Sequence, residues 1–176
     1  NEYHKRFLHQ LVSSQLDMDR MDYLIRDSFY SGVQEGVIGS DRIIHMLNVV
    51  EDKLVIESKG VYSIEKFLIA RRLMYWQVYL HKTVLSAENM LIKVLKRAKE
   101  LSQSGDELFG SSALKLFLKN NFTLDDFKKN EEVFQAFTRL DDQDILAAIK
   151  EWQFHEDKIL AILSNKIIQR KLLKIE

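Results

Sequence analysis

The sequence of 176 residues contains no cysteine and no proline, and only six glycines. Without cysteine the chain has neither a disulfide scaffold nor a cysteine-ligated zinc site, and this favours a reducing compartment, so we expect a cytoplasmic protein. No apolar run approaches the roughly 20 residues that a membrane span requires, so we expect no membrane association. The first ten residues, "NEYHKRFLHQ", have no initiator Met and no signal-like apolar core, which indicates a piece of a longer chain.

The chain also lacks net charge, because its 26 basic side chains are matched by 26 acidic ones. Charge is nevertheless uneven. Residues 66–100 carry eight Lys or Arg and two Glu (8 − 2 = +6), whereas residues 101–157 carry six basic and twelve acidic residues (6 − 12 = −6). A solvated helix face or pairing between the two regions accounts for most of these charges. Nucleic acid is an unlikely partner, since the acidic region cancels the field of the basic one.

The scarcity of helix breakers predicts an all-α, mainly helical fold. Apolar residues recur at spacings of three and four from Tyr62 to Leu101, which predicts one very long helix. Shorter helices are predicted at about 110–120, 123–128, 130–140, 141–154 and 155–172, several of them opening on Thr, Asn or Asp. Residues 48–62 interrupt the helical pattern: "KLVIE" alternates and is β-branched, and Glu51-Asp52 and Lys59-Gly60 are turn residues. We expect one short β-hairpin there.

Four aspartates gather in the short stretch "SSQLDMDRMDYLIRDSFYSGV", residues 13–33. On a helix, Asp19, Tyr23 and Asp27 lie four residues apart along one stripe, while Asp22 and Arg26 form their own i,i+4 pair. Asp is unfavourable inside helices, so repeated Asp on one stripe suggests that it holds a hard cation or a substrate hydroxyl. Structural carboxylate networks produce similar clusters, and the residues alone leave both interpretations open.

Two segments carry a resemblance to a known family: "QLDMDRMDYLIRDSFYSGV", residues 15–33, and "KGVYSIEKFLIARRLMYWQVYLHKTV", residues 59–84. They closely resemble HD-domain phosphohydrolases, in particular the branch of deoxynucleoside triphosphate triphosphohydrolases. The resemblance implies an HD-domain-like helical fold whose N-terminal part is missing here. It covers residues 11–91 best. Residues 1–101, with the hairpin and the long helix, would then be the C-terminal portion of the HD domain, and residues 102–176 a C-terminal helical subdomain.

The resemblance also implies roles for individual residues. Asp19 matches the last aspartate ligand of the family's metal site, and Arg20 resembles a phosphate-contacting residue, so these two are the expected catalytic residues. The residues expected to bind substrate are Tyr23 and Asp27 at the sugar and its 3′-hydroxyl, Arg71 at the triphosphate, Tyr79 packed on the sugar, and Lys82. Lys82 and His81 match a pair that lies near a regulatory nucleotide in some members. The implied cofactor is a divalent metal ion (Mg, Mn, Fe, Ni or Zn).

One departure from the family is the absence of its other metal ligands, a His and a consecutive His-Asp pair that lie N-terminal to the LDxDR helix. No His in this chain is followed by Asp. The N-terminal half of the HD domain is therefore an expected partner, together with a nucleotide or phosphoester substrate and further copies of the chain in a homo-oligomer. Leu80 stands where dNTPase relatives carry a polar residue, which leaves the substrate open.

The expected function is thus part of a metal-dependent phosphohydrolase acting on nucleotides, with the isolated chain inactive because ligands are absent. The alternative is a helical interaction or regulatory module of the same origin, without catalytic activity. The filled sugar and phosphate positions favour the first interpretation, and the missing His-Asp pair favours the second.

Overall fold

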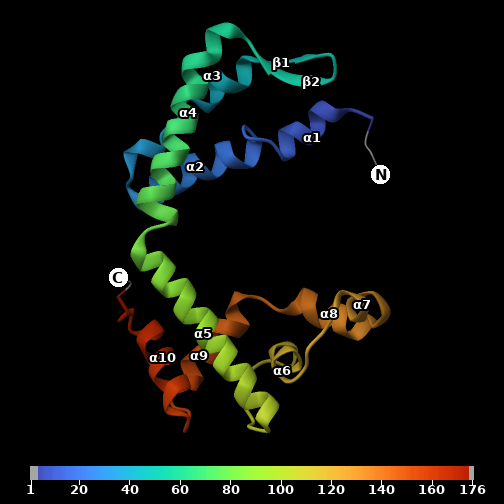
Figure 1. Cartoon of the computed structure of the whole chain (residues 1–176), viewed down its shortest axis with the longest axis vertical. Coiled ribbons are helices and arrows are strands. Elements are labelled where there is room, and N and C mark those ends of the chain that lie inside the picture. Colours follow the sequence, from blue (N-terminus) through green and yellow to red (C-terminus); the bar gives the residue numbers. More distant parts are fainter. Residues whose placement is uncertain (1–3, 175–176) are drawn as a thin grey trace. The chain divides into compact units, whose positions relative to one another are not determined.

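The computed structural model describes residues 4–174, which form a mainly helical chain with one two-stranded antiparallel sheet (Figure 1). This confirms the expected fold class. The chain divides into two compact units, residues 1–81 and residues 82–176. The domain border expected after residue 101 lies inside a helix of the second unit, and the proposed HD-domain organisation stays a prediction.

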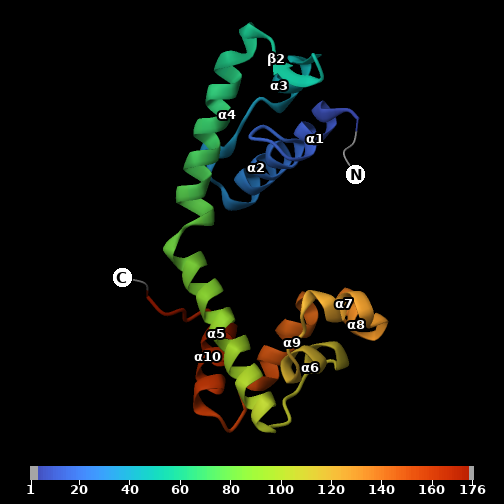
Figure 2. The ribbon, with the colours of Figure 1, turned by 45° about the vertical axis from the view of Figure 1, so that its right-hand side comes forward.

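The first unit holds residues 15–33 and 59–81 of the two segments that carry the family resemblance. Its elements are α1 (Arg6–Val12), α2 (Met18–Ser31), η1 (Gln34–Gly36), α3 (Ser40–His45), β1 (Leu47–Val50), β2 (Lys53–Ile56), η2 (Ser58–Gly60), α4 (Val61–Met74) and the π-helix η3 (Tyr75–Tyr79). In both views the hairpin lies at the N-terminal end of α4, and α2 lies beside the same helix further along (Figures 1 and 2).

The predicted hairpin is confirmed. Glu51 and Asp52 connect β1 and β2 with φ values of 49° and 58°. Positive φ at both central residues is the hallmark of a type I′ turn, whose twist matches that of the strands. The Asp52 carboxylate accepts a hydrogen bond from the Arg6 amide at 2.9 Å, and the Gln10 side chain accepts one from the Leu54 amide at 2.8 Å. These bonds fasten α1 to the hairpin.

The core of the first unit lies between α2, α3 and α4. Its buried members are Met21, Leu24, Ile38, Ile43, Phe67, Ala70 and Met74. Gly36 of η1 allows the close approach of α2 and α4, because a Cβ at this position would lie 2.7 Å from the Ser28 Cβ and 2.8 Å from the Met74 Sδ. The packing therefore requires glycine at position 36, and it brings the neighbouring polar faces of α2 and α4 together.

The single long helix predicted from Tyr62 to Leu101 is wrong. Helix α4 ends at Met74 and continues as a π-helix to Tyr79, and Leu80 and His81 separate it from α5 (Lys82–Ser104). No proline or glycine marks the interruption. It coincides instead with a contact of Tyr79 with α2, described below. The spacing of apolar residues reflects the geometry of one segment and not its contacts with distant segments. The helical spacing therefore continues through the break.

The second unit is entirely helical in its described part. Its elements are α5 (Lys82–Ser104), α6 (Ser112–Lys119), α7 (Leu124–Lys129), α8 (Glu131–Arg139), α9 (Asp142–Trp152) and α10 (Lys158–Ile168). Thr123, Asn130 and Asp141 immediately precede α7, α8 and α9, as expected, and the side chains of Asn130 and Asp141 accept hydrogen bonds from first-turn amides. The Thr123 hydroxyl instead donates to the Asp126 carboxylate at 2.7 Å. The Asn130 Oδ1 accepts from the Glu132 amide at 3.0 Å, and the Asp141 Oδ1 accepts from the Gln143 amide at 2.8 Å.

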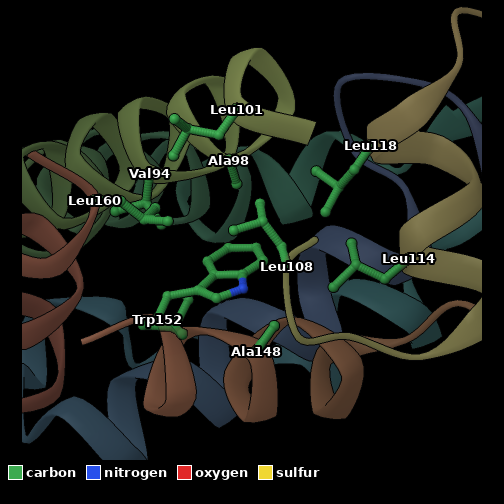
Figure 3. Packing of buried hydrophobic residues seen from close by; sticks show 10 residues of the cluster. Val94, Ala98, Leu101, Leu108, Leu114, Leu118, Ala148, Trp152 and Leu160 are labelled. Atoms are coloured by element: carbon green, nitrogen blue, oxygen red, sulfur yellow. The ribbon is translucent and has the colours of Figure 1, made fainter. Parts of the chain in front are cut away.

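Trp152 lies in the core of the second unit. Its side chain is 1% exposed, and its indole N–H donates to the Phe109 carbonyl at 2.9 Å. Figure 3 shows the ring among aliphatic side chains from the helices and from the loop after α5. This core consists of Val94, Ala98, Leu101, Leu108, Leu114, Leu118, Ala148, Ile149, Trp152 and Leu160.

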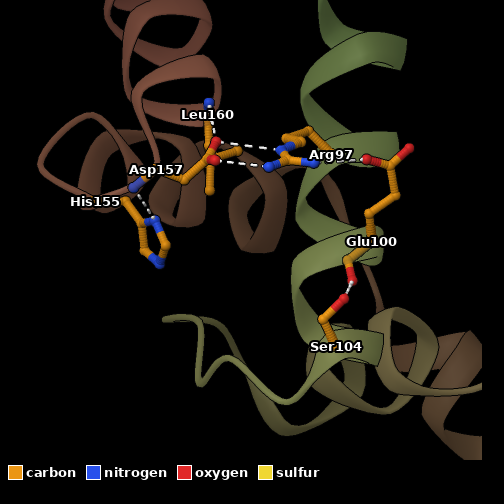
Figure 4. Close-up of polar contacts among 6 residues, drawn as sticks. All are labelled: Arg97, Glu100, Ser104, His155, Asp157 and Leu160. Atoms are coloured by element: carbon orange, nitrogen blue, oxygen red, sulfur yellow. Dashed lines mark hydrogen bonds and ion pairs between the residues drawn. The ribbon is translucent and has the colours of Figure 1, made fainter.

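Arg97 links the basic and acidic parts of this unit, as the charge pattern suggests. Its guanidinium donates to both carboxylate oxygens of Asp157, at 3.2 and 2.7 Å, and to Glu100 at 3.0 Å (Figure 4). Asp157 also caps α10 by accepting from the Leu160 amide at 2.8 Å. The hydrogen bond from Arg97 and that from the Leu160 amide lower the pKa of Asp157 to about 2, since both favour the charged carboxylate.

Candidate functional site

Helix α2 presents the first half of the candidate site. Asp17 caps the helix by accepting from the Arg20 amide at 2.8 Å, and Gly32 ends it in the left-handed conformation with φ of 72°. Between these ends Asp19, Tyr23 and Asp27 follow one another at intervals of four residues and share one stripe, as predicted. Asp19 is exposed, whereas Tyr23 and Asp27 are half-buried.

The second half of the site comes from α4 and η3. The Tyr79 hydroxyl donates to the Asp27 carboxylate with a distance of 2.7 Å between the oxygens, and this bond joins residues 52 positions apart. The Tyr79 ring meets the Tyr23 ring edge to face at 5.9 Å between centroids. Tyr23, Asp27 and Tyr79, for which the family resemblance implies a place at the sugar, are therefore brought together in the first unit.

Both of these tyrosine hydroxyls are protonated donors at neutral pH. Burial raises the pKa of Tyr79 well above its usual value of 10, and the hydrogen bond to Asp27 raises it further. Burial also raises the pKa of Tyr23, followed by the charge of Tyr75 and a hydrogen bond with its side chain, while the positive charges of Arg20 and Arg71 lower it. Each hydroxyl therefore stays neutral beside the Asp27 carboxylate and the arginines, which suits the recognition of sugar hydroxyls.

The two arginines expected at phosphate are held in different ways. Arg20 donates to the Asp17 carboxylate and to the Ser14 carbonyl. Arg71 donates to the Gln15 amide oxygen at 2.8 Å, and its guanidinium lies 5.8 Å from the centre of the Tyr75 ring. Within residues 4–174, Arg71 forms no ion pair with a carboxylate. The Arg71 guanidinium is therefore held by neutral groups.

Asp19 and Asp22 lie on the same helix in different surroundings. Asp22 forms an ion pair with Arg26. In the part of the chain that the structure describes, the Asp19 carboxylate has neither a hydrogen bond nor an ion pair, so it is chemically fit to ligate a cation. The described residues contain no group of three His, Cys, Asp or Glu that could hold a metal ion. Asp19 thus fits one position of a metal site, and residues 4–174 do not complete that site.

Lys82 and the other predicted site residues fall in different units of the chain. Lys82 is the exposed first residue of α5 and belongs to the second unit, whereas Asp19, Arg20, Tyr23, Asp27, Arg71 and Tyr79 belong to the first.

Sequence reasoning missed Gln15 and Tyr75. Tyr75 lies four residues after Arg71 and four before Tyr79, and this spacing would have placed it on their stripe. No local signal marks Gln15, because its partner Arg71 lies 56 residues away.

Comparisons with known proteins relate this chain to HD-domain proteins. Residues 38–110 match the family described as HD associated region. The whole chain is similar to a crystal structure of a phosphohydrolase from Bacteroides thetaiotaomicron, with 61% identity, a TM-score of 0.96 and coverage of 99% of this chain. It is 36% identical over 174 residues to the uncharacterized protein YwfO of Bacillus subtilis, which covers 98% of this chain. A deoxynucleoside triphosphate triphosphohydrolase SAMHD1 homolog of Dictyostelium discoideum is 28% identical over 107 residues, which are 59% of this chain and 21% of that protein.

The chain spans 38% of YwfO and 43% of the Bacteroides phosphohydrolase. Between residues 4 and 174, no helix combines the length and the apolar character needed to cross a membrane.

Proposed function

From the relation of this chain to HD-domain phosphohydrolases, we propose that it forms part of a metal-dependent enzyme that hydrolyses nucleotides, similar to the deoxynucleoside triphosphate triphosphohydrolases. The observation that carries the proposal is the bond between Asp27 and Tyr79, with Tyr23 against Tyr79 and Arg71 on the same side of α4. Scaffolding alone does not require a carboxylate, two neutral hydroxyls and a guanidinium that, within residues 4–174, contacts only neutral groups.

Each residue of this cluster has a chemical role in the proposal. Asp27 and Tyr23 bind sugar hydroxyls, and the wrong sugar would leave a half-buried polar group unpaired at a cost of about 1 to 3 kcal/mol. Tyr79 packs its ring on the sugar and holds Asp27 in place through its hydroxyl. Arg20 and Arg71 bind phosphate oxygens, for which the planar guanidinium fork is suited. Lys82 contributes a further positive charge to substrate or regulatory nucleotide.

Asp19 is assigned as one metal ligand, because its carboxylate is exposed and unpaired in the described chain. The remaining ligands, a His and a His-Asp pair in related enzymes, have to come from outside these 176 residues. A bound divalent cation supplies polarisation of a phosphoryl oxygen and a water of lowered pKa. The residues of this chain bind and orient the nucleotide.

A non-catalytic module is the second candidate, and the lack of a three-ligand group among residues 4–174 favours it. The two candidates can be distinguished at Asp19. The proposed enzyme needs the Asp19 carboxylate as a metal ligand, whereas a module without metal does not.

Substitution of Asp19 therefore tests the proposed function. In the protein that carries this chain with its other HD-domain residues, Asp19→Ala should abolish hydrolysis of deoxynucleoside triphosphates and reduce bound metal, because a ligand is lost. Asp22→Ala is the matched control: it lies on the same helix and breaks only the exposed pair with Arg26, so its kinetics should not change. Equal activity in Asp19→Ala and Asp22→Ala would refute the ligand assignment.

Substitution of Arg71 tests the phosphate role. Arg71→Lys keeps the charge and loses the planar fork, so catalysis should weaken, and Arg71→Ala should lose about 1.5 to 3 kcal/mol of transition-state stabilisation. Melting temperature and specific activity are measured on the same preparations. If both variants lower only the melting temperature, Arg71 is a structural residue.

A further inference from the structure

Helix α4 and the first residues of η3 are apolar on two opposite sides. Phe67, Ala70 and Met74 are buried on one side, and Figure 2 shows α1, α2, α3 and the hairpin together on one side of α4. The exposed side carries six large apolar side chains, which are Val61, Tyr62, Leu68, Ile69, Tyr75 and Trp76. A helix that is apolar all round is normally covered all round, and contiguous exposed apolar surface marks an interaction site.

We infer that these six residues, with Glu65 and Arg72 among them, form an interface that binds the same residues of a second copy of the chain, with the two α4 helices antiparallel. We call this surface the α4 face. The inference goes beyond the proposed function, because it concerns assembly and uses none of the residues assigned to nucleotide or metal.

The order of residues along the α4 face is symmetric about the point between Leu68 and Ile69. A two-fold axis through this point places each residue before it opposite the residue of the partner that lies equally far after it. Each apolar side chain then meets an apolar one: Val61 faces Trp76 of the partner subunit, Tyr62 faces Tyr75 of the partner subunit, and Leu68 faces Ile69 of the partner subunit. The face is therefore complementary to itself.

Glu65 and Arg72 make the charges of the α4 face complementary as well. They lie equally far before and after the same point, so Glu65 faces Arg72 of the partner subunit, and this contact occurs twice in a dimer. A parallel arrangement would instead set each of these charges against its own copy, which is unfavourable. Charge thus selects the antiparallel pairing.

The charges of Glu65 and Arg72 are available for this pairing. Both side chains are exposed, and between residues 4 and 174 neither of them forms an ion pair. Seven positions on a helix separate them by about 10 Å along the axis, too far for an ion pair with each other. The Arg72 guanidinium lies 4.5 Å from the centre of the Trp76 ring, which holds it on the α4 face.

Charge reversal tests the pairing in the protein that carries this chain. Glu65→Lys sets two positive charges against each other at both contacts of a dimer, and Arg72→Glu sets two negative charges against each other. Each variant should therefore raise the Kd of self-association roughly tenfold or more, measured by sedimentation equilibrium at low salt. Glu35→Lys is the matched control: Glu35 is exposed on η1, outside the α4 face, so the same change of charge should leave the Kd unaltered.

Mixing the two variants separates pairing from misfolding. In a mixed dimer of Glu65→Lys with Arg72→Glu, both contacts again join opposite charges, so an equimolar mixture should associate with close to the Kd of the unsubstituted protein. A folding defect does not recover on mixing. The inference is overturned if the mixture associates no better than each variant alone, or if the unsubstituted protein sediments as a monomer.

Ile69→Asp distinguishes a second copy from other parts of a longer chain as the cover of the α4 face. Ile69 is 59% exposed next to the proposed axis. If a second copy covers the face, Ile69→Asp should abolish self-association and keep the circular dichroism spectrum of the folded protein. A lowered melting temperature with an unchanged molecular mass would show that the protein's own remaining residues cover the face, and would overturn the inference.

Discussion

The hydrogen bond between Tyr79 and Asp27 predicts an energetic coupling that can be measured without knowing the substrate. Tyr79→Phe removes the donor and keeps the ring, and Asp27→Ala removes the acceptor. Asp27→Ala also removes the 3.8 Å ion pair with Arg26, but a double-mutant cycle cancels this effect because it occurs with and without the Tyr79 hydroxyl. The cycle therefore isolates the coupling between Tyr79 and Asp27.

The structure sets the size of this coupling. Hydrogen bonds to charged groups contribute about 1.5 to 3 kcal/mol, and solvent reduces that contribution where the acceptor is exposed. The Asp27 side chain is 33% exposed, and the bond is short at 2.7 Å. We therefore expect a coupling of about 1 to 2 kcal/mol in the free energy of unfolding.

Urea unfolding at neutral pH, followed by circular dichroism, measures this coupling in the four proteins of the cycle. Tyr62→Phe is the control, because Tyr62 lies on α4 and is 83% exposed, and its stability should not change. The pKa of Tyr79 is raised above its ordinary value, so its contribution is full below about pH 10 and declines as the pH rises further. A coupling below about 0.3 kcal/mol at neutral pH would mean that the two halves of the site are not joined by this bond.

Three further predictions concern stability and are all measured by urea unfolding. Asp157→Asn keeps a cap for α10 and loses the charge that binds Arg97, so it should lower the free energy of unfolding. Because the folded pKa of Asp157 is about 2, this loss of stability should be full above about pH 4 and should vanish as the pH falls through 2. A loss of stability that does not change with pH would contradict the ion pair. Gly36→Ala should cost about 1 to 3 kcal/mol by overpacking, whereas Gly39→Ala, whose Cβ would have no neighbour closer than 3.9 Å, should be tolerated. Trp152→Phe should cost about 1 to 3 kcal/mol through the lost indole bond and volume, and a loss below about 0.5 kcal/mol would place the indole outside the core.

The local features of this protein follow from its sequence. The caps at Asn130 and Asp141 and the turn at Glu51-Asp52 depend on side chains and backbone within a few residues, so short-range rules predict them. The stripe of Asp19, Tyr23 and Asp27 follows from helix geometry in the same way. The roles of its members came from resemblance to a family and remain proposals.

The tertiary structure decided which of these stripes face each other. The bond between Asp27 and Tyr79 and the contact of Arg71 with Gln15 join residues 52 and 56 positions apart. The α-helix that carries Arg71 ends at Met74, close to these contacts in the sequence. Helical periodicity records only which face of a segment is apolar, and α4 continues that pattern into α5 without a break. The sequence by itself therefore determined the hairpin turn, the helix caps at Asn130 and Asp141 and the residue types on each helix face, because these depend on local sterics and hydrogen bonds. Long-range contacts such as these, and the close packing of Gly36 against Ser28 and Met74, depend on the fit of side chains from separate segments, which no local pattern encodes.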